Sequence, residues 1–225
     1  MDIASYLIDE KEIVLITEDN KGKQYMEYSN GNDKFKFEKI VVLVNENTAS
    51  ASEVLTAALS EHLDNVTVVG ANTYGKGTVQ HSRIFEDGSA MKYTTAEWLT
   101  PRGNKINKVG IKPDVEVNLH PVLSGIFPVM EDNQTFTYNS VGVQVAAVQS
   151  MFDFLSYDIE REDGYFDKSL EAAINEFKES KDLIADGVLD KDLYEMLISK
   201  TIREWNENTK AYDTQLEKAL VIINE

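Results

Sequence analysis

Two short segments contain residue types that could perform nucleophilic chemistry. The first is Asn45–Glu53 (NENTASASE), which places Ser50 between an apolar run and a helical pattern. The second is Gly75–Gln80 (GKGTVQ), in which Lys76 stands between two glycines, 26 positions after Ser50. A serine hydroxyl needs a base to remove its proton, and a lysine can act as that base only in its neutral form. The two segments therefore predict a nucleophile, Ser50, and a general base, Lys76.

Neighbouring groups could support this pair. The first N–H groups of a helix are unpaired and lie at the positive end of the helix dipole, so they can stabilise a developing oxyanion. We predict that the backbone N–H of Ala51 is such a donor. We also expect Lys76 to be buried beside apolar groups, because desolvation disfavours the charged form of an amine. Gln80 lies two side-chain alternations further along the chain, so its amide could orient that amine.

Each of these residues also has a simpler structural interpretation. Ser50 alone would be a helix cap, and Lys76 alone would be a solvated surface lysine. Ser52 is the main alternative for the nucleophile. Glu53 could act as a general base, but an acid three positions after a helix cap is more typical of a helix N-terminus.

Apolar runs predict the elements that position these groups. Ile40–Val44 (IVVLV) is continuous rather than alternating, which is typical of a strand buried on both faces. Helical spacing follows over Ser50–Leu63, and Val66–Val69 is a second buried strand. This order predicts a parallel βαβ unit, in which the carboxyl ends of the strands meet at one edge of the sheet. Thr78–Phe85 and Ala90–Leu99 flank an Asp-Gly turn and predict a β-hairpin.

Other kinds of site are less well supported. Gly70–Thr78 nearly matches a phosphate-binding loop, but Gly77 replaces the required hydroxyl residue and a strand pattern follows. His62, His81 and His120 are too few and too scattered for a metal cluster. A Ser-His-Asp triad lacks the G-x-S-x-G elbow that would support it. The sequence therefore predicts no metal or organic cofactor.

The second half of the chain is helical and contains a short repeat. Its predicted helices are Val141–Leu155, Lys168–Lys178, Lys191–Ile198 and a final amphipathic helix, Glu204–Glu225, with Leu216, Leu220 and Ile223 on one face. The repeat consists of Asp163–Asp167 (DGYFD) and Asp186–Asp190 (DGVLD). Each copy predicts a glycine turn followed by an aspartate N-cap, rather than a calcium loop.

Composition limits the partners and the number of domains. The chain has 225 residues and a net charge of -17, which would repel nucleic-acid phosphates, so we exclude nucleic acid as a partner. It contains no cysteine, so redox chemistry leaves the compartment open. No apolar run is long enough for a membrane span. The length and the change from sheet to helix patterns predict two domains.

The first half closely resembles the C-terminal processing peptidases, also called tail-specific proteases, a Ser/Lys family of serine peptidases. Four segments match in the family's order: VVLVNENTASASEVL, VVGANTYGKGTVQ, DGSAMKYTTAEWLTPRG and VGIKPDVEV. The resemblance implies an α/β catalytic region with a crotonase-like or ClpP-like sheet. It implies that Ser50 is the nucleophile, Lys76 the base and Gln80 the lysine-orienting amide. The implied reaction is amide hydrolysis through an acyl-enzyme, near the C-termini of protein substrates and without a cofactor.

The second half resembles a small three-helix peptidoglycan-binding module, which some bacterial members of this peptidase family carry. The matching segments are Val145–Gln149, Asp163–Asp167, Ala173–Phe177 and Asp186–Asp190, whereas Lys178 stands where glutamine is common. The implied partners are protein or peptide substrates and peptidoglycan, outside the cytoplasm of a bacterium or at its boundary. A homodimer is compatible with the sequence, which leaves the oligomeric state open.

These resemblances predict four segments along the chain. They are the C-terminal part of a peptidase domain (residues 1–119), a connector (120–139), the peptidoglycan-binding-like module (140–202) and a C-terminal helix (203–225). Family members carry a PDZ domain and a Gly-Gly turn with a second oxyanion donor ahead of the matching region. We therefore expect an N-terminally truncated catalytic region that lacks this second donor, which leaves the activity of this chain alone open. The alternative is an inactive fragment or paralogue that acts as a cell-wall or protein-binding module.

Overall fold

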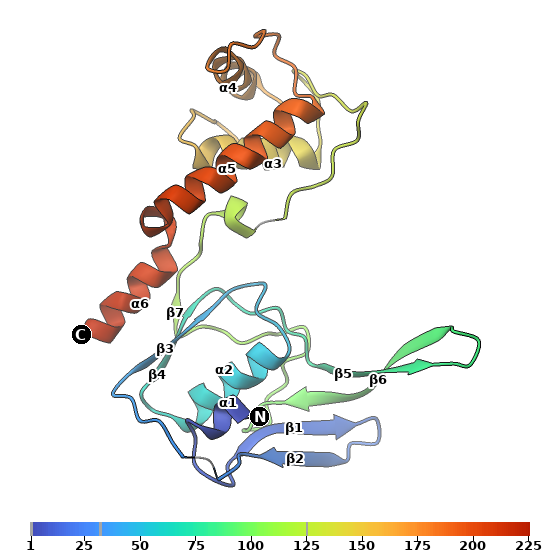
Figure 1. Ribbon diagram of the computed structural model, residues 1–225, viewed down its shortest axis with the longest axis vertical. Coiled ribbons are helices and arrows are strands. Elements are labelled where there is room, and N and C mark those ends of the chain that lie inside the picture. The colour runs from blue at the N-terminus through green and yellow to red at the C-terminus, as the bar shows by residue number, and fades with distance from the viewer. Residues whose placement is uncertain (1, 32, 125) are drawn as a thin grey trace. The chain divides into compact units, whose positions relative to one another are not determined.

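Short strands and a helix form the part of the chain that contains Ser50 and Lys76. The computed structural model describes residues 2–31, 33–124 and 126–225 and has a mixed α/β fold (Figure 1). The chain divides into two units, each described by itself below. Unit 1 comprises residues 1–118 and 214–225, and unit 2 comprises residues 119–213.

A parallel sheet in unit 1 is built from the predicted βαβ segment. Strand β3 (Ile40–Val44) leads into helix α2 (Ala51–His62), which leads into strand β4 (Val66–Gly70). The two strands pair in parallel, with Ile40 opposite Val66 and Val44 opposite Gly70, and β7 (Val115–Glu116) pairs with the other side of β4. The prediction of a parallel βαβ unit is therefore confirmed.

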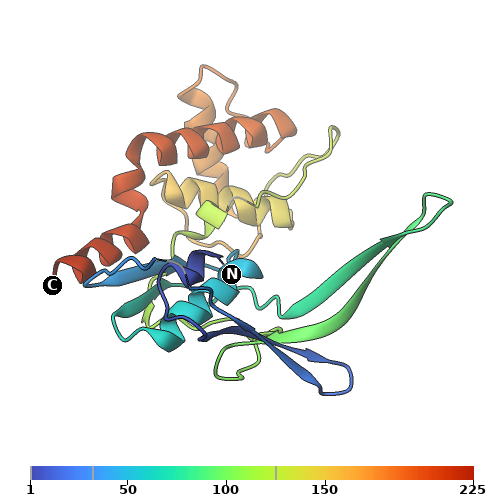
Figure 2. The same cartoon turned by 60° about the horizontal axis from the view of Figure 1, so that its bottom comes forward.

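An antiparallel sheet is the second sheet of unit 1. Its strands, in the order β2-β1-β6-β5, are β1 (Ile13–Asp19), β2 (Gln24–Tyr28), β5 (Thr78–Ile84) and β6 (Ala90–Leu99). The predicted β5–β6 hairpin is confirmed, and its turn is closed by a hydrogen bond from the Phe85 N–H to the Ser89 carbonyl. Figure 2 shows this hairpin extending well beyond the other strands of the sheet.

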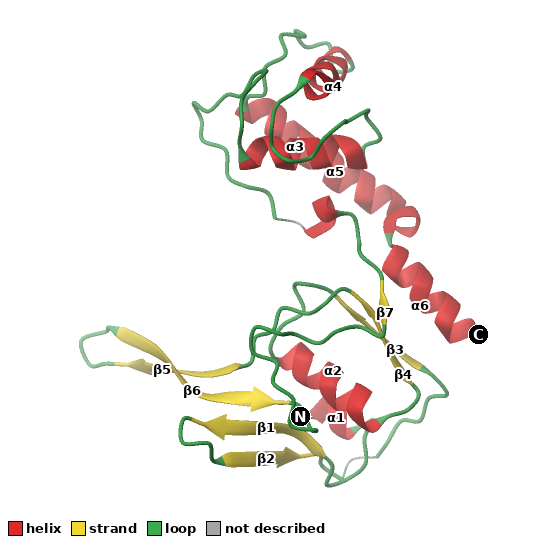
Figure 3. Ribbon diagram, turned by 180° about the vertical axis from the view of Figure 1, so that it is seen from behind, coloured by secondary structure: helices red, strands yellow, loops and turns green. Residues whose placement is uncertain are grey.

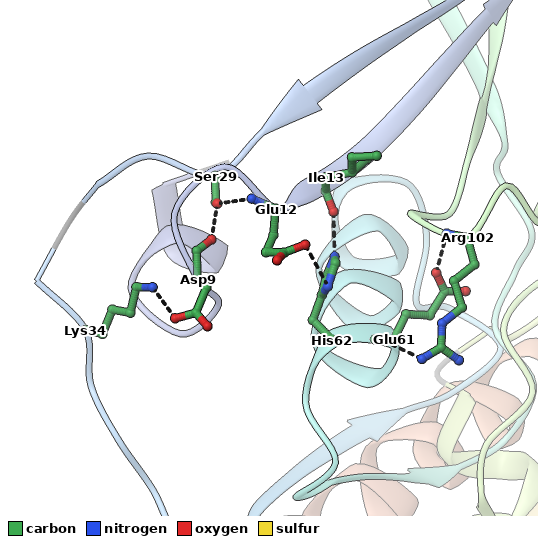
Figure 4. A network of polar contacts seen from close by, with 8 residues as sticks. All are labelled: Asp9, Glu12, Ile13, Ser29, Lys34, Glu61, His62 and Arg102. Carbon is green, nitrogen blue, oxygen red and sulfur yellow. Dashed lines mark hydrogen bonds and ion pairs between the residues drawn. The ribbon is translucent and has the colours of Figure 1, made fainter.

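The start of the chain packs against α2. Helix α1 (Asp2–Ser5) and the residues after it contribute to an apolar cluster of Ala4, Ile8, Val14, Ala58 and Leu59. Polar contacts surround the last turn of α2 (Figure 4). His62 Nε2 lies 2.7 Å from the Ile13 carbonyl, and the Arg102 N–H donates to the Glu61 carboxylate at 2.7 Å. The end of α2 farthest from Ser50 is thus anchored at several points.

Helix α6 (Thr214–Asn224) completes unit 1. The Gln215 side-chain amide donates to the Val117 carbonyl at 2.8 Å, and Gln215 and Ala219 are the buried residues of the helix. Leu216, Leu220 and Ile223 lie at helical spacing on one face of α6, as predicted, and all three are exposed. Gln215 packs closely against β4, since a Cβ atom at Gly70 would lie 3.2 Å from its amide nitrogen.

Unit 2 consists of helices around one apolar core (Figure 3). Its elements are the 3-10 helix η1 (Pro121–Ser124) and helices α3 (Val143–Phe154), α4 (Lys168–Glu179) and α5 (Lys191–Tyr212). The predicted N-caps are confirmed. The Asp167 side chain accepts the Leu170 N–H at 3.0 Å, and the Asp190 side chain accepts the Leu193 N–H at 2.8 Å.

Two parts of unit 2 differ in detail from the sequence patterns. The segment expected to be a connector, residues 120–139, also buries Val122, Met130 and Phe136 in the core of unit 2. The helix expected over Glu204–Glu225 is interrupted at Asp213, where the backbone leaves the helical region between α5 and α6. Within the described part of the chain, we find no helix with the length and hydrophobicity needed to span a bilayer.

Candidate active site

Ser50 occupies a sharp turn between β3 and α2. It is the N-cap of α2, and its backbone angles are φ 58° and ψ -118°. Positive φ is unfavourable for a residue with a side chain, and such strain is concentrated at functional sites. A strained turn from strand to helix is also how serine nucleophiles are presented in other hydrolases. Ser50 and Ser52 are both exposed, and Ser52 lies within the first turn of α2.

The carboxylate of Glu53 holds the turn in place. Glu53 is completely buried, and its Oε2 atom accepts the backbone N–H of Ser50 at 2.9 Å. The same Oε2 atom accepts the backbone N–H of Lys76, also at 2.9 Å. The amide nitrogens of Ser50 and Lys76 are therefore at most about 5.8 Å apart, twice the length of one bond. The two segments singled out in the sequence meet at a single oxygen atom.

The other oxygen of Glu53 binds the segment that precedes Lys76. Its Oε1 atom accepts the Thr73 hydroxyl at 2.5 Å and the Gly75 N–H at 2.7 Å. The Tyr74 N–H donates to the Thr48 carbonyl at 2.9 Å, which adds a direct bond between the two segments. Four donors thus satisfy one buried carboxylate, as a buried charge requires.

The loop around Lys108 packs against the backbone on both sides of Lys76. The Lys108 N–H donates to the Gly75 carbonyl at 2.8 Å. A Cβ atom on Gly77 would lie 2.4 Å from the Asn107 nitrogen, and Gly75 has φ 81°. Glycine is therefore required at both positions. At Gly77 the reason is the close approach of the backbone, and at Gly75 it is a close approach together with a positive φ.

Lys76 and Gln80 line one pocket. Its volume is about 820 Å³, and its lining residues are Asn47, Ala49, Tyr74, Gly75, Lys76, Thr78, Gln80, Asn107 and Lys108. The expected burial of Lys76 is wrong, because the residue is exposed. The glycines bury the backbone on either side of it, but its side chain extends from that buried backbone into an open pocket. Among the described residues, no hydrogen bond joins Lys76 to Ser50 or to Gln80.

The predicted oxyanion donor, Ala51, follows two residues after Ala49, which lines this pocket. Ala51 is the first residue of α2, and the first backbone bond of that helix runs from the Val54 N–H to the Ser50 carbonyl at 3.0 Å. The Ala51 N–H therefore belongs to the group of helix N-terminal donors that have no acceptor within the helix.

None of the three histidines, all of which the structure describes, lines this pocket. His62 ends α2, about 18 Å from its start at 1.5 Å per residue, and pairs with Glu12 (Figure 4). His81 lies on the exposed hairpin, and His120 contacts Asp153 in unit 2. The near match to a phosphate loop is followed by strand β5, as its pattern predicted, and the N–H groups of its Gly75 and Lys76 bind Glu53.

Two features of the site were missed by sequence reasoning. Glu53 was expected to complete the start of α2, which it does, but its three bonds to Thr73, Gly75 and Lys76 were not anticipated. The wall formed by Asn107 and Lys108 was also missed. The glycine between Val109 and Ile111 was a signal for it, because a Cβ atom on Gly110 would lie 2.2 Å from the Thr73 carbonyl oxygen.

Comparison with protein families gives one match in each unit. The model of peptidase family S41 matches residues 1–117, and the chain belongs to this family. A second model, described as a putative peptidoglycan binding domain, matches residues 141–197. The family matches thus cover most of unit 1 and the helical part of unit 2 up to Leu197.

Individual relatives are similar over nearly the whole chain. A probable CtpA-like serine protease of Staphylococcus epidermidis is 35% identical over 217 residues, which are 96% of this chain and 44% of the relative. The carboxy-terminal processing protease CtpA of Bacillus subtilis is 36% identical over 89% of this chain and 44% of the relative. The chain therefore spans less than half the length of these curated relatives.

Solved structures include a photosystem II D1 C-terminal processing protease. It is 36% identical, with a TM-score of 0.48, and the match covers 53% of this chain and 31% of that protein.

Proposed function

We propose that this chain provides the nucleophile and general base of a serine endopeptidase, Ser50 and Lys76. The observation that carries the proposal is the shared carboxylate, because Glu53 Oε2 accepts the backbone N–H groups of both residues. The strained backbone at Ser50 favours it over Ser52 as the nucleophile. Membership in peptidase family S41 supports the same type of chemistry.

The proposed reaction proceeds through an acyl-enzyme. The Ser50 hydroxyl attacks the scissile carbonyl carbon while the neutral amine of Lys76 takes the hydroxyl proton. The Ala51 N–H and the start of α2 stabilise the resulting oxyanion. The amide C–N bond then breaks, and Lys76 returns the proton to the leaving amine. Water hydrolyses the remaining ester of Ser50 by the same route. Gln80 orients the lysine from its place on the wall of the pocket.

Labelling with a fluorophosphonate probe tests this proposal directly. We expect probe incorporation in the unmodified chain, loss of labelling in Ser50→Ala and retention in the matched variant Ser52→Ala. Lys76→Ala should slow labelling, because it removes the base while Ser50 remains. Equal labelling of the Ser50→Ala and unmodified proteins would refute the assignment of the nucleophile. Digestion of casein by the same four proteins reports whether the chain also turns over protein substrates.

The fold type, the cleavage position and the binding partner in this proposal are inferred from similarity to the relatives. We propose that the sheets of unit 1 form part of a crotonase-like or ClpP-like catalytic region and that substrates are cut near their C-termini. We propose that unit 2 binds peptidoglycan, in line with the family match over residues 141–197. A location outside the bacterial cytoplasm would give both units access to their partners. A homodimer remains part of the proposal, and sedimentation would test it.

A second candidate function is binding without proteolysis. It is favoured by the exposure of Lys76 and by the lack, among the described residues, of a hydrogen bond between Lys76 and Ser50. In that case the chain would co-sediment with purified peptidoglycan while showing neither probe labelling nor casein digestion. Labelling that depends on Ser50 would exclude this candidate.

A further inference from the structure

We infer that Lys108 forms a subsite for a substrate carboxylate beside the Ser50–Lys76 pair. The inference rests on the proposed function. It begins with the charge of the pocket, because the lining contains Lys76 and Lys108 but none of its nine residues is acidic. The whole chain, by contrast, carries a net charge of -17. A pocket whose lining includes the cation Lys108 and no acid, in an acidic protein, attracts anionic groups selectively.

Two carboxylates that contact the residues around the pocket are already occupied. Glu53 is completely buried, and its two oxygens accept four hydrogen bonds from the turn and from the Lys76 segment. Glu97 accepts the Asn107 side-chain amide at 2.9 Å. In the part of the chain that the structure describes, neither Lys76 nor Lys108 takes part in an ion pair. Lys108 is therefore open to an incoming anion.

The backbone of Lys108 gives a second argument. Lys108 has φ 62°, in the left-handed region that glycine and asparagine favour over lysine. Its N–H bond to the Gly75 carbonyl fixes this conformation directly beside the Lys76 segment. The Lys108 side chain is exposed and lines the pocket. Because strained backbone is concentrated at functional sites, its conformation supports a functional role for Lys108.

The roles of the two lysines differ. Lys76 must be neutral to accept the proton of Ser50, so it is unsuited to hold an anion during the attack. Lys108 has no such constraint and can remain an ammonium group. We assign it to a carboxylate near the scissile bond, either an acidic side chain or the free C-terminus of the substrate. Pairing of exposed charges supplies a modest preference, of about fivefold at most.

Peptide binding to the full chain with Ser50→Ala, which prevents turnover, tests the inference. Fluorescent peptides are compared in two matched arms by anisotropy. One arm replaces a single glutamine by glutamate at successive positions, and the other replaces a C-terminal amide by a free carboxylate. We expect the acidic member of one arm to bind about fivefold more tightly, and we expect this ratio to shrink at high salt. The arm that shows the preference identifies the source of the carboxylate.

Three variants decide whether Lys108 is responsible. Lys108→Gln should reduce the ratio to about one, and Lys108→Arg should restore it by restoring the charge. Lys105→Gln, an exposed lysine of the same loop that does not line the pocket, should leave it unchanged. An unchanged ratio in Lys108→Gln, an equal fall in Lys105→Gln, or no binding of any acidic peptide would overturn the subsite. Thermal unfolding of each variant identifies any loss of folding.

The two proposals fail in different ways. If the probe labels the chain at Ser50 but acidic peptides bind no more tightly than neutral ones, the subsite alone is refuted. A preference that depends on Lys108 in a chain that the probe does not label would refute the peptidase assignment alone.

Discussion

The starts of three helices show two ways of satisfying the same unpaired N–H groups. Helices α4 and α5 of unit 2 begin after Asp167 and Asp190, whose backbones are extended, with φ -100° and -109°. Each aspartate accepts one N–H of its own helix. Helix α2 of unit 1 begins instead after Ser50, whose backbone is strained. The acid at this end, Glu53, is three residues further on and binds two different segments.

The comparison separates local capping from positioning. In unit 2 each cap stabilises only its own helix, so the backbone can stay relaxed. In unit 1 the acid also fixes the Lys76 segment, and the strain at Ser50 is maintained by bonds that come from both sides. A strained residue persists only when its surroundings determine its conformation. At the start of α2, the unfavourable backbone conformation of Ser50 is therefore retained together with bonds that fix the Ser50 and Lys76 segments relative to each other.

The largest expected effect comes from breaking the shared carboxylate. Glu53→Ala should lower the free energy of unfolding of unit 1 by at least about 3 kcal/mol, because each buried donor without a partner costs roughly 1–3 kcal/mol. Urea unfolding followed by Trp98 fluorescence, in a Trp205→Phe background, measures unit 1 because the chain has two tryptophans, one in each unit.

Glu46→Ala, which removes an exposed acid from the same strand-to-helix segment, is the matched control and should change stability little. If Glu53→Ala were no more destabilising than this control, the carboxylate would not be holding the two segments. Glu53→Gln, which keeps the size but replaces one acceptor oxygen with a donor, should lie between them.

An intermediate effect is expected for the caps of unit 2. Asp167→Ala and Asp190→Ala should each destabilise unit 2 by about 1 kcal/mol, since each removes one side-chain acceptor from a helix start. Thermal unfolding followed by helical circular dichroism measures this loss. Asp158→Ala, at an exposed position outside both caps, serves as the comparison. Labelling of Ser50 should be unaffected, and a loss of labelling in the cap variants would contradict the separation of capping from positioning.

The smallest effect concerns pH. The side-chain hydrogen bond from Lys178 Nζ to Asp186, 2.6 Å long, lowers the pKa of Asp186 below its usual 3.8. Because the folded pKa is below the unfolded value, the pair stabilises unit 2 above about pH 4. This contribution is lost as the pH falls through the folded pKa.

Asp186 is 47% exposed, so the contribution should be less than about 1 kcal/mol. Acid titration of the unfolding free energy below pH 4 should show a shallower decline for Asp186→Asn than for the unmodified chain. Identical slopes for the two proteins would assign the acid sensitivity to other groups.

The sequence predicted the parts of the fold that depend on local pattern. The Asp-Gly hairpin turn and the aspartate caps appear as expected, because neighbouring residues decide each of them. Ile40–Val44 forms the expected strand, but its predicted burial on both faces is wrong, since only Val44 is buried and Leu43 is exposed. The approach of the Ser50 and Lys76 segments also followed from the order strand, helix, strand. Parallel strands bring their carboxyl ends to one edge whatever the side chains are.

The sequence failed where distant segments decide the outcome. The exposure of Lys76 depends on how the 106–110 loop packs against glycines some thirty positions earlier, which no local pattern encodes. The burial of Gln215 was not anticipated, because its hydrogen-bond acceptor is the Val117 carbonyl, 98 positions away. The additional bonds of Glu53 have the same origin, because its partners at residues 73–76 belong to another turn.

The return of the chain to unit 1 at residue 214 has a consequence for synthesis. Helix α6 is added to unit 1 only after residues 119–213 have been translated. The growing chain can close the core of unit 2 on the ribosome while the Val117 carbonyl still lacks the amide of Gln215. The part that contains Ser50 is thus begun first and finished last.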